Sequence, residues 1–172
     1  MPSAVTELVT RRLILRPVVP DDFEPLAAIW TDPLVMRHMS GRTRNAAESR
    51  DRIRELMEHQ RHHGFGKWTV VERATGEPIG YCGIELYEGG PDVELGFCLA
   101  RSAWGRGYAT EAARTSLEHG LAALGFERVL AVVDPANRAS MRVLEKLRLT
   151  CLGPTMVEGR EWLLYEARRQ SS

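Results

Sequence analysis

Two glycines one residue apart are the residues of this sequence with the most evident chemical use. Gly105 and Gly107 lie in "ARSAWGRGYATEA", between a predicted strand and a predicted helix. Glycine lets the backbone adopt positive φ and approach a ligand without an intervening Cβ. The N–H groups of such a turn, at the positive end of a helix dipole, form an anion site of phosphate size, and Arg101 or Arg106 could add charge. An ordinary strand-to-helix turn would use the same glycines for geometry alone, so both interpretations remain open.

Two common phosphate loops do not fit the sequence. The string G-x-x-x-x-G-K-[ST] of nucleoside-triphosphate loops does not occur in it. The dinucleotide fingerprint G-x-G-x-x-[GA] would begin at Gly105, but Thr110 stands where the third small residue is required. The preceding strands also have the pattern of an antiparallel meander, whereas that fingerprint needs a βαβ unit. An anion at this turn would therefore be held by another kind of loop.

A carboxylate lies on the strand that leads into this turn. Alternation in "VELGFCL" gives an apolar face, which we expect in the core, and a face with one carboxylate and two small side chains. The apolar face has Val93, Leu95, Phe97 and Leu99, and the other face has Glu94, Gly96 and Cys98. The second face would leave room for an extended ligand beside an acid. The ordinary alternative for Glu94 is a solvated or salt-bridged carboxylate.

Asn137 and Ser140 stand three residues apart at the start of the predicted helix "NRASMRVLEKLRL". This spacing is typical of an ordinary helix N-cap, in which the first side chain accepts a hydrogen bond from the later backbone N–H. Their residue types alone therefore assign them no chemistry.

Histidine and cysteine positions predict no metal site. The string "HQRHHG" lies at the end of a predicted helix, where cations interact favourably with the helix dipole. The five histidines are His38, His59, His62, His63 and His119, and the three cysteines are Cys82, Cys98 and Cys151. They form no CxxC pair and show no ligand spacing, which is typical of small core cysteines in a reducing compartment.

Length and charge exclude several classes of protein. The chain has 172 residues, which suits one domain over 1–172 with a core that needs no disulfide. Its 23 basic and 23 acidic residues give a formal charge of zero, so neither nucleic acid nor a membrane is expected as a partner. It contains no run of ~18 apolar residues and no signal-like start. We therefore expect a soluble cytoplasmic protein.

The predicted elements alternate along the whole chain. Strands are predicted over 11–18, 67–73, 78–88, 92–100, 128–134, 150–157 and 160–169, and helices over 20–32, 45–64, 107–125 and 137–149, with Asp21 as the cap of the first helix. The fold class is α+β, with a mixed but mostly antiparallel central sheet of about six to seven strands flanked by about four helices.

The glycine turn and its neighbours carry a family resemblance. "LARSAWGRGYATEA" resembles the pyrophosphate-binding segment, [RQ]-x-x-G-x-[GA], of the GNAT superfamily of acyl-CoA-dependent N-acyltransferases. "DVELGF", "DPANRASMRVLEKLRL" and the opening "TRRLILRPVVPDDFEPLAAIWTDPLVMRHM" resemble the branch that includes ribosomal-protein N-terminal acetyltransferases. The similarity covers the chain from about Thr10 to Ala167. The sequence departs from the family pattern at three positions. Ser102 replaces Arg or Gln, Leu144 replaces the tyrosine that protonates the leaving thiolate in many members, and Arg148 replaces glycine.

The resemblance implies a site for acetyl-CoA. It predicts that the backbone of Phe97, Cys98 and Leu99 pairs with the pantetheine arm, and that Asn137 contacts the same arm. The turn over Gly105, Arg106, Gly107, Tyr108, Ala109 and Thr110 would hold the pyrophosphate. Trp104 would pack over the cofactor or over the neighbouring helix, and Lys146 would either reach the adenosine phosphates or remain a surface lysine.

The resemblance also implies a reaction, in which a primary amine receives the acetyl group by direct attack in a ternary complex. The amine must be neutral, so Glu94 is the expected general base, and Ser140 is the expected hydrogen-bond donor to the leaving thiolate. The acceptor would be a protein N-terminus or a small molecule, and the protein a monomer or homodimer. The alternatives are a CoA-binding module without catalysis and a transferase for a larger acyl group such as succinyl.

The resemblance further implies that the acceptor cleft is formed by "TDPLVMRHMSGRTRN" and the last hairpin around "VEGREW". These segments contain Arg37, Arg42, Arg44 and Arg160. The arginines would either bind an acidic substrate or be solvated charges.

Overall fold

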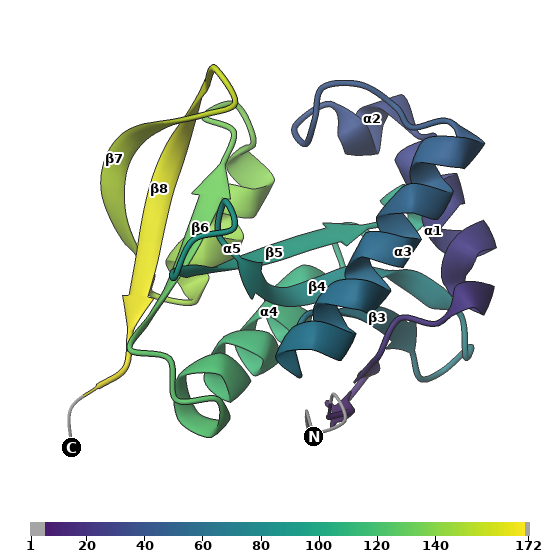
Figure 1. Ribbon diagram of the computed structural model, residues 1–172, viewed down its shortest axis with the longest axis horizontal. Coiled ribbons are helices and arrows are strands. Elements are labelled where there is room, and N and C mark those ends of the chain that lie inside the picture. Colours follow the sequence, from purple (N-terminus) through teal and green to yellow (C-terminus); the bar gives the residue numbers. More distant parts are fainter. Residues whose placement is uncertain (1–5, 171–172) are drawn as a thin grey trace.

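The strands form one sheet of eight, in the order β1-β2-β3-β4-β5-β6-β8-β7, in the computed structural model, which describes residues 6–170 (Figure 1). The strands are β1 (Leu8–Val9), β2 (Leu13–Arg16), β3 (Lys67–Glu72), β4 (Pro78–Leu86), β5 (Val93–Leu99), β6 (Arg128–Val133), β7 (Thr150–Val157) and β8 (Arg160–Arg168). The helices are α1 (Phe23–Trp30), α2 (Pro33–Met36), α3 (Ala46–His63), α4 (Tyr108–Glu118) and α5 (Arg138–Lys146).

Local sequence sets the limits of the longest helix. Asn45 and Glu48 form a capping box at the start of α3, in which each side chain accepts a 2.9 Å hydrogen bond from the other residue's backbone N–H. The helix ends at Gly64, which has φ of 72° and so makes a left-handed cap. Within residues 6–170, no helix is both long and apolar enough to span a bilayer.

Buried residues form two cores on opposite faces of the sheet. Apolar residues of α1, α2 and α3 pack on one face, where Tyr81 and Cys98 are buried with them. Residues of α4 and α5 pack on the other face, against Cys82, Leu99 and further apolar side chains of β2 to β6. Alternation along β4 and β5 thus supplies both cores, and it fixes which side chains of β5 face which helices.

The sheet changes character between β5 and β6. The other neighbouring strands pair in antiparallel fashion, whereas β5 and β6 are parallel and joined by α4. Their register consists of one pair, Glu94 with Leu130. Beyond this pair the two strands separate, and Figure 1 shows β6, β8 and β7 diverging from β3, β4 and β5. The sheet is therefore closed at one end of this junction and open at the other.

The structure confirms the predicted α+β class and a mostly antiparallel sheet. Each predicted strand and helix is present, and the observed counts are slightly higher than predicted. The two extra elements are β1, which has two residues, and α2, which has four. Neither is long enough to show a periodic pattern in the sequence.

The predicted cap of the first helix is wrong by one residue. Asp22, not Asp21, is the buried carboxylate before α1, and it is 1% exposed. It accepts hydrogen bonds from Arg16 at 2.7 and 2.9 Å, from Thr69 Oγ1 at 2.7 Å and from Val19 N at 3.0 Å. Burial opposes ionisation, yet these donors lower the pKa of Asp22. Its partners lie on β2 and β3, so the adjacent residues alone could not distinguish the two aspartates.

The end of α5 has the backbone of a glycine cap without a glycine. Arg148 has φ of 61°, its N–H donates to Glu145 O, and Leu149 N donates to Leu144 O. This is the Schellman arrangement, in which glycine is favoured because a Cβ is strained at positive φ.

Arg148→Gly is therefore expected to stabilise the protein by about 1 kcal/mol, because it removes the strain of a Cβ in the left-handed region. Urea denaturation at neutral pH measures the change. Arg148→Ala, which removes the charge but keeps the Cβ, is the control and should give no such gain. Equal stability of wild type and the glycine variant would contradict the strain.

Candidate active site

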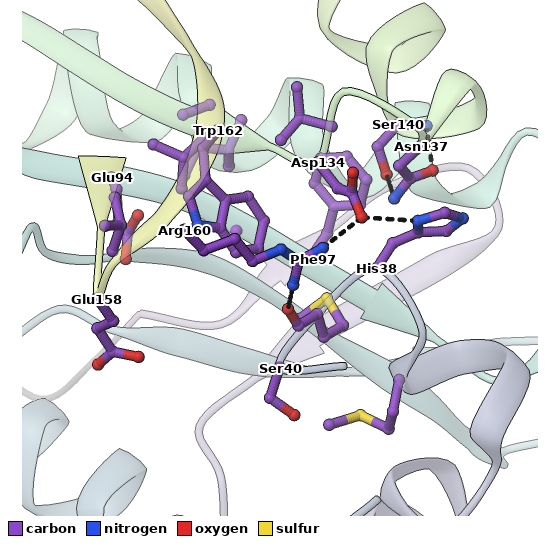
Figure 2. Close-up of a pocket in the computed structure, with 18 of the residues that line it drawn as sticks. His38, Ser40, Glu94, Phe97, Asp134, Asn137, Ser140, Glu158, Arg160 and Trp162 are labelled. Atoms are coloured by element: carbon purple, nitrogen blue, oxygen red, sulfur yellow. Dashed lines mark hydrogen bonds and ion pairs between the residues drawn. The ribbon is translucent and has the colours of Figure 1, made fainter. Parts of the chain in front are cut away.

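A cleft with a volume of about 610 Å³ opens where β5 and β6 separate. Its walls come from β5, β6, the start of α5, the segment after α2 and the β7–β8 hairpin. Figure 2 shows Glu94 and Glu158 at one end of this cleft and His38, Asn137 and Ser140 at the other. Both ends carry polar groups that could act on a ligand held between them.

Glu94 lies beside a second carboxylate whose charge is already compensated. Its cross-strand neighbour is Glu85 of β4, which accepts 2.6 Å and 3.1 Å hydrogen bonds from Lys67 and Arg52. Burial opposes ionisation of Glu85, but the two cations lower its pKa to about 2. Burial raises the pKa of Glu94, the charge of Lys67 opposes that shift, and the like charge on Glu85 adds to it. Glu85 therefore stays ionised, whereas Glu94 is suited to exchanging a proton.

The face of β5 that carries Glu94 is less open than the alternation predicts. A Cβ at Gly96 would lie 2.9 Å from the Nζ atom of Lys67, so the lysine side chain already covers this glycine. Cys98 is buried in the core beneath α1, and burial raises the pKa of its thiol to about 12. Phe97, predicted for the core face, is only partly buried and lines the cleft. Side chains from other elements thus limit the open part of this face to the surroundings of Glu94.

The backbone of β5 offers unpaired groups toward β6. Backbone groups of alternate residues in an antiparallel ladder point to opposite neighbours. Ala100 N donates to Ile79 O beside β4, so the N–H and C=O groups of Phe97 and Leu99 point to the β6 side, where the strands have separated. The Leu99 carbonyl accepts a 3.0 Å hydrogen bond from the Trp104 indole. Within residues 6–170, the remaining groups have no partner on β6, so they can pair with an extended ligand.

The turn before α4 has the geometry of an anion site. Gly105 and Gly107 have φ of 71° and 78°, and the turn is exposed. The first helical hydrogen bond runs from Glu111 N to Gly107 O, so the preceding N–H groups of α4 have no helical acceptor. Gly107 has no side chain to cap them. The turn therefore presents backbone donors at the positive end of a helix.

Two side chains of this turn point back to the sheet. The Arg106 guanidinium lies 2.8 Å from Glu72, and the Tyr108 hydroxyl donates to the same carboxylate. The buried Tyr108 ring lies between the guanidinium groups of Arg12 and Arg106, at 4.5 and 4.6 Å. Arg101 lies 3.1 Å from Asp32. Arg106 can reach a ligand only by leaving Glu72, so the backbone is the permanent part of the anion site.

Asn137 and Ser140 form the predicted cap and a side-chain contact as well. Asn137 Oδ1 accepts from Ser140 N at 3.2 Å, and Asn137 Nδ2 donates to Ser140 Oγ at 2.9 Å. Because the Ser140 oxygen accepts from the amide, its own O–H remains available to donate into the cleft. Leu144, one turn later, also lines the cleft and offers no polar group.

A cluster that the sequence analysis missed closes the His38 end of the cleft. Asp134 Oδ2 lies 2.9 Å from His38 Nδ1 and 2.5 Å from Arg160, whose guanidinium also donates to Met39 O at 3.0 Å. Figure 2 shows Asp134 between the arginine and the imidazole. The cluster joins three segments distant in sequence: the loop after α2, the end of β6 and the start of β8. Asp134 lies in the quoted string "DPAN", but nothing local predicts its partners.

The predicted site residues thus fall into groups. Glu94, Phe97, Asn137 and Ser140 line the cleft. Cys98 and Leu99 end β5, Trp104 to Gly107 form the turn after it, and Tyr108 to Thr110 begin α4. Lys146 lies exposed at the last residue of α5 and is not among the residues that line the cleft. The cleft residues that the sequence analysis missed as a site include Lys67, Arg52 and Asp134, which are recognisable only once the strands are paired.

Comparisons with known proteins agree with this architecture. A family model described as an acetyltransferase (GNAT) domain matches residues 12–150. The chain is 36% identical to the uncharacterized protein YkkB of Bacillus subtilis, over 84% of this chain and 86% of that one. It is 31% identical to an uncharacterized N-acetyltransferase, p20, of Bacillus licheniformis, over 81% and 80% of the two chains.

Solved structures share the fold. An acetyltransferase from Agrobacterium tumefaciens has a TM-score of 0.86 and 27% identity, covering 96% of this chain and 95% of that one. RimL, a ribosomal α-N-protein acetyltransferase solved in complex with coenzyme A, has a TM-score of 0.77 over 94% and 96% of the chains. Its 14% identity shows likeness of fold alone.

Removing the carboxylate of Glu85 tests the charge arrangement beside Glu94. Glu85→Gln is expected to lower the free energy of unfolding by about 3 kcal/mol at pH 7, because Lys67 and Arg52 lose their buried counterion. The pKa of Glu85 is lowered in the folded state, so its stabilisation is complete above the ordinary value of 4.5 and is lost as the pH falls toward about 2. Urea denaturation at pH 7 and pH 3 should show the difference between wild type and variant shrinking in acid. A constant difference would contradict this arrangement.

Proposed function

The chain belongs to the acetyltransferase (GNAT) family, and we propose that it transfers an acetyl group from acetyl-CoA to a primary amine within a ternary complex. The acceptor is a small molecule or a protein N-terminus. The observation that carries the proposal is the separation of β5 from β6, which begins beyond Glu94 and extends toward the glycine turn at the other end of β5. One strand thus leads from a backbone anion site to a carboxylate with a raised pKa.

The fit of acetyl-CoA rests on features of the backbone. The free N–H groups at the start of α4 suit a pyrophosphate, and the unpaired edge of β5 at Phe97 and Leu99 suits the amide-bearing pantetheine arm. Trp104 is 48% exposed and is held by its bond to Leu99 O, so its ring offers a surface between these two parts. When bound, acetyl-CoA supplies the acetyl group as a thioester, and thiol pKa values of about 8.5 make the thiolate a tolerable leaving group.

Glu94 accepts the proton of the acceptor ammonium in this proposal. Its carboxylate lines the cleft, and its raised pKa brings it closer to the pH at which a general base works best. The neighbouring Glu85 stays ionised because of Lys67 and Arg52, so its charge favours proton uptake by Glu94 without competing for the proton.

Ser140 and Asn137 act on the leaving thiolate, at the end of the cleft opposite Glu94. The Asn137 amide donates to Ser140 Oγ, which orients the serine proton away from the asparagine and toward the cleft. A hydroxyl stabilises a developing thiolate by donating a hydrogen bond and does not need to give up its proton. Backbone N–H groups of β5 that point toward β6 would polarise the thioester carbonyl in the same way.

Native mass spectrometry with acetyl-CoA, followed by thiol release with peptides, polyamines, amino acids and aminoglycosides, tests the proposal. We expect one bound acetyl-CoA per chain and amine-dependent thiol release. Binding without release across the panel would favour a CoA-binding module, and preference for a longer thioester would favour another acyl group. Absence of binding at millimolar acetyl-CoA would overturn the proposal.

Glu94→Gln separates the base from the binding site. The variant should bind acetyl-CoA like wild type but lose at least about a hundredfold in kcat at pH 7, with a smaller loss at high pH, where the amine deprotonates by itself. Because burial raises the pKa of Glu94, the acid limb of the wild-type rate profile should lie above pH 4.5 and disappear in the variant. Glu118→Gln, at an exposed position on α4, is the control. If the variant has the pH–rate profile of wild type, Glu94 is not the general base.

Gly107→Glu places a side chain and a negative charge against the proposed pyrophosphate site. We expect acetyl-CoA to bind at least about tenfold more weakly, because charge-assisted contacts to the phosphates are lost. Gly76→Glu is the matched control, since Gly76 has φ of 73° in the exposed β3–β4 turn and suffers the same backbone strain. Isothermal titration measures both variants. If the folded Gly107→Glu variant binds acetyl-CoA as tightly as wild type, the pyrophosphate does not bind at this turn.

A further inference from the structure

The cations that line the cleft differ in whether they have a partner. Lys67 and Arg52 are paired with Glu85, Arg160 with Asp134, and Arg42 with Glu48 at 2.8 Å. Arg44 lines the same cleft, and within residues 6–170 its guanidinium has neither an ion pair nor a hydrogen bond. The adjacent carboxylate of Glu48 is already occupied by Arg42 and by Asn45 N.

Arg44 is held where a free charge is costly. Its backbone N–H donates to Trp30 O at 3.0 Å, and its guanidinium lies 5.8 Å from the Trp30 ring. The residue is half-buried and its Nε atom is fully buried without an acceptor. The ring offsets part of the lost hydration through a cation–π interaction, but the Nε–H donor remains unsatisfied. Because Arg44 is only half-buried and lines the cleft, the rest of its guanidinium can bind a ligand anion there.

A second unpartnered charge, of opposite sign, lines the cleft. Within the described residues, Glu94 has no ion pair or side-chain hydrogen bond, whereas Asp134 is paired with Arg160 and also contacts His38 Nδ1. Glu158 is exposed at the same end as Glu94 and adds negative charge there (Figure 2). A ligand with an ammonium group and an anionic group would match both free charges at once.

From these charges we infer that the acceptor is an amine that also bears a carboxylate, with the amine directed to Glu94 and the carboxylate bound by Arg44. The inference rests on the proposed function and adds the substrate class. The carboxylate could belong to a free amino acid or to an acidic side chain near a peptide N-terminus. The phosphates of acetyl-CoA are not the expected anion, because the turn at Gly105 and Gly107 is not part of the cleft lining.

Matched acceptors distinguish the two sources of the carboxylate. Initial rates are compared for amino acids and their carboxamides, and for C-terminally amidated peptides with glutamate or glutamine at the second residue. A higher rate with the amino acid than with its carboxamide indicates that Arg44 binds the carboxylate of a free amino acid. A higher rate with the glutamate peptide than with the glutamine peptide indicates that it binds an acidic side chain. Equal use of the charged and uncharged member of both pairs would overturn the inference.

Arg44→Met tests the residue itself. The variant should raise KM for the carboxylated acceptor at least about tenfold, with kcat and acetyl-CoA affinity unchanged and no loss of thermal stability, since an unpaired cation is removed. Arg44→Lys should retain part of the affinity, and Arg37→Met, at an exposed position of the same segment that does not line the cleft, should change KM less than about twofold. An unchanged KM in Arg44→Met would overturn the inference.

A binding measurement separates this inference from the proposed catalysis. The same acceptors are titrated calorimetrically into wild type and Arg44→Met in the presence of CoA. Weaker binding of the carboxylated ligand by the variant supports the inference even if no acceptor turns over, in which case the proposed catalysis has failed. Equal binding by both proteins overturns the inference even if turnover is observed.

Discussion

The separation of β5 from β6 is the constraint on which the candidate site depends. Backbone N–H and C=O groups in a sheet interior require partners, and here the register stops after Glu94 and Leu130. Because α4 makes a parallel crossover between the two strands, its N-terminus lies directly after the unpaired end of β5. An incomplete ladder and a helix start thus become neighbours through chain connectivity. Together they suit a ligand with an extended amide-bearing arm and an anionic end.

The electrostatics of the cleft follow from which charges are satisfied within the protein. Glu85 is paired with two cations and stays ionised, which leaves the adjacent Glu94 as the carboxylate with the raised pKa. Asp134 likewise holds Arg160 and His38 and ties the β7–β8 hairpin to the loop after α2. Within residues 6–170, Glu94 and Arg44 are the half-buried charges of the cleft without an ion pair, so a ligand can interact with them most strongly.

The sequence predicted features that depend on near neighbours and missed those that join distant segments. Alternation and caps such as Asn45 and Gly64 are local, so the strands and helices were predicted within a few residues. Glu94 and the glycine turn were joined into one candidate site by the family resemblance, because their residue types alone also fit an ordinary strand and an ordinary turn. The covering of Gly96 by Lys67 could not be predicted, since it depends on the pairing of β3, β4 and β5. Asp22 was missed for the same reason, because Thr69 on β3 is among its partners.

Residue-level amide hydrogen exchange, with and without acetyl-CoA, tests most directly whether the open edge of β5 and the start of α4 form one cofactor site. The account predicts that acetyl-CoA slows exchange at Phe97 and Leu99 and at the first amides of α4, Tyr108 to Thr110, while amides of β7 are unaffected. Binding of acetyl-CoA without added protection at these amides would contradict it, because the cofactor would then lie elsewhere on the protein.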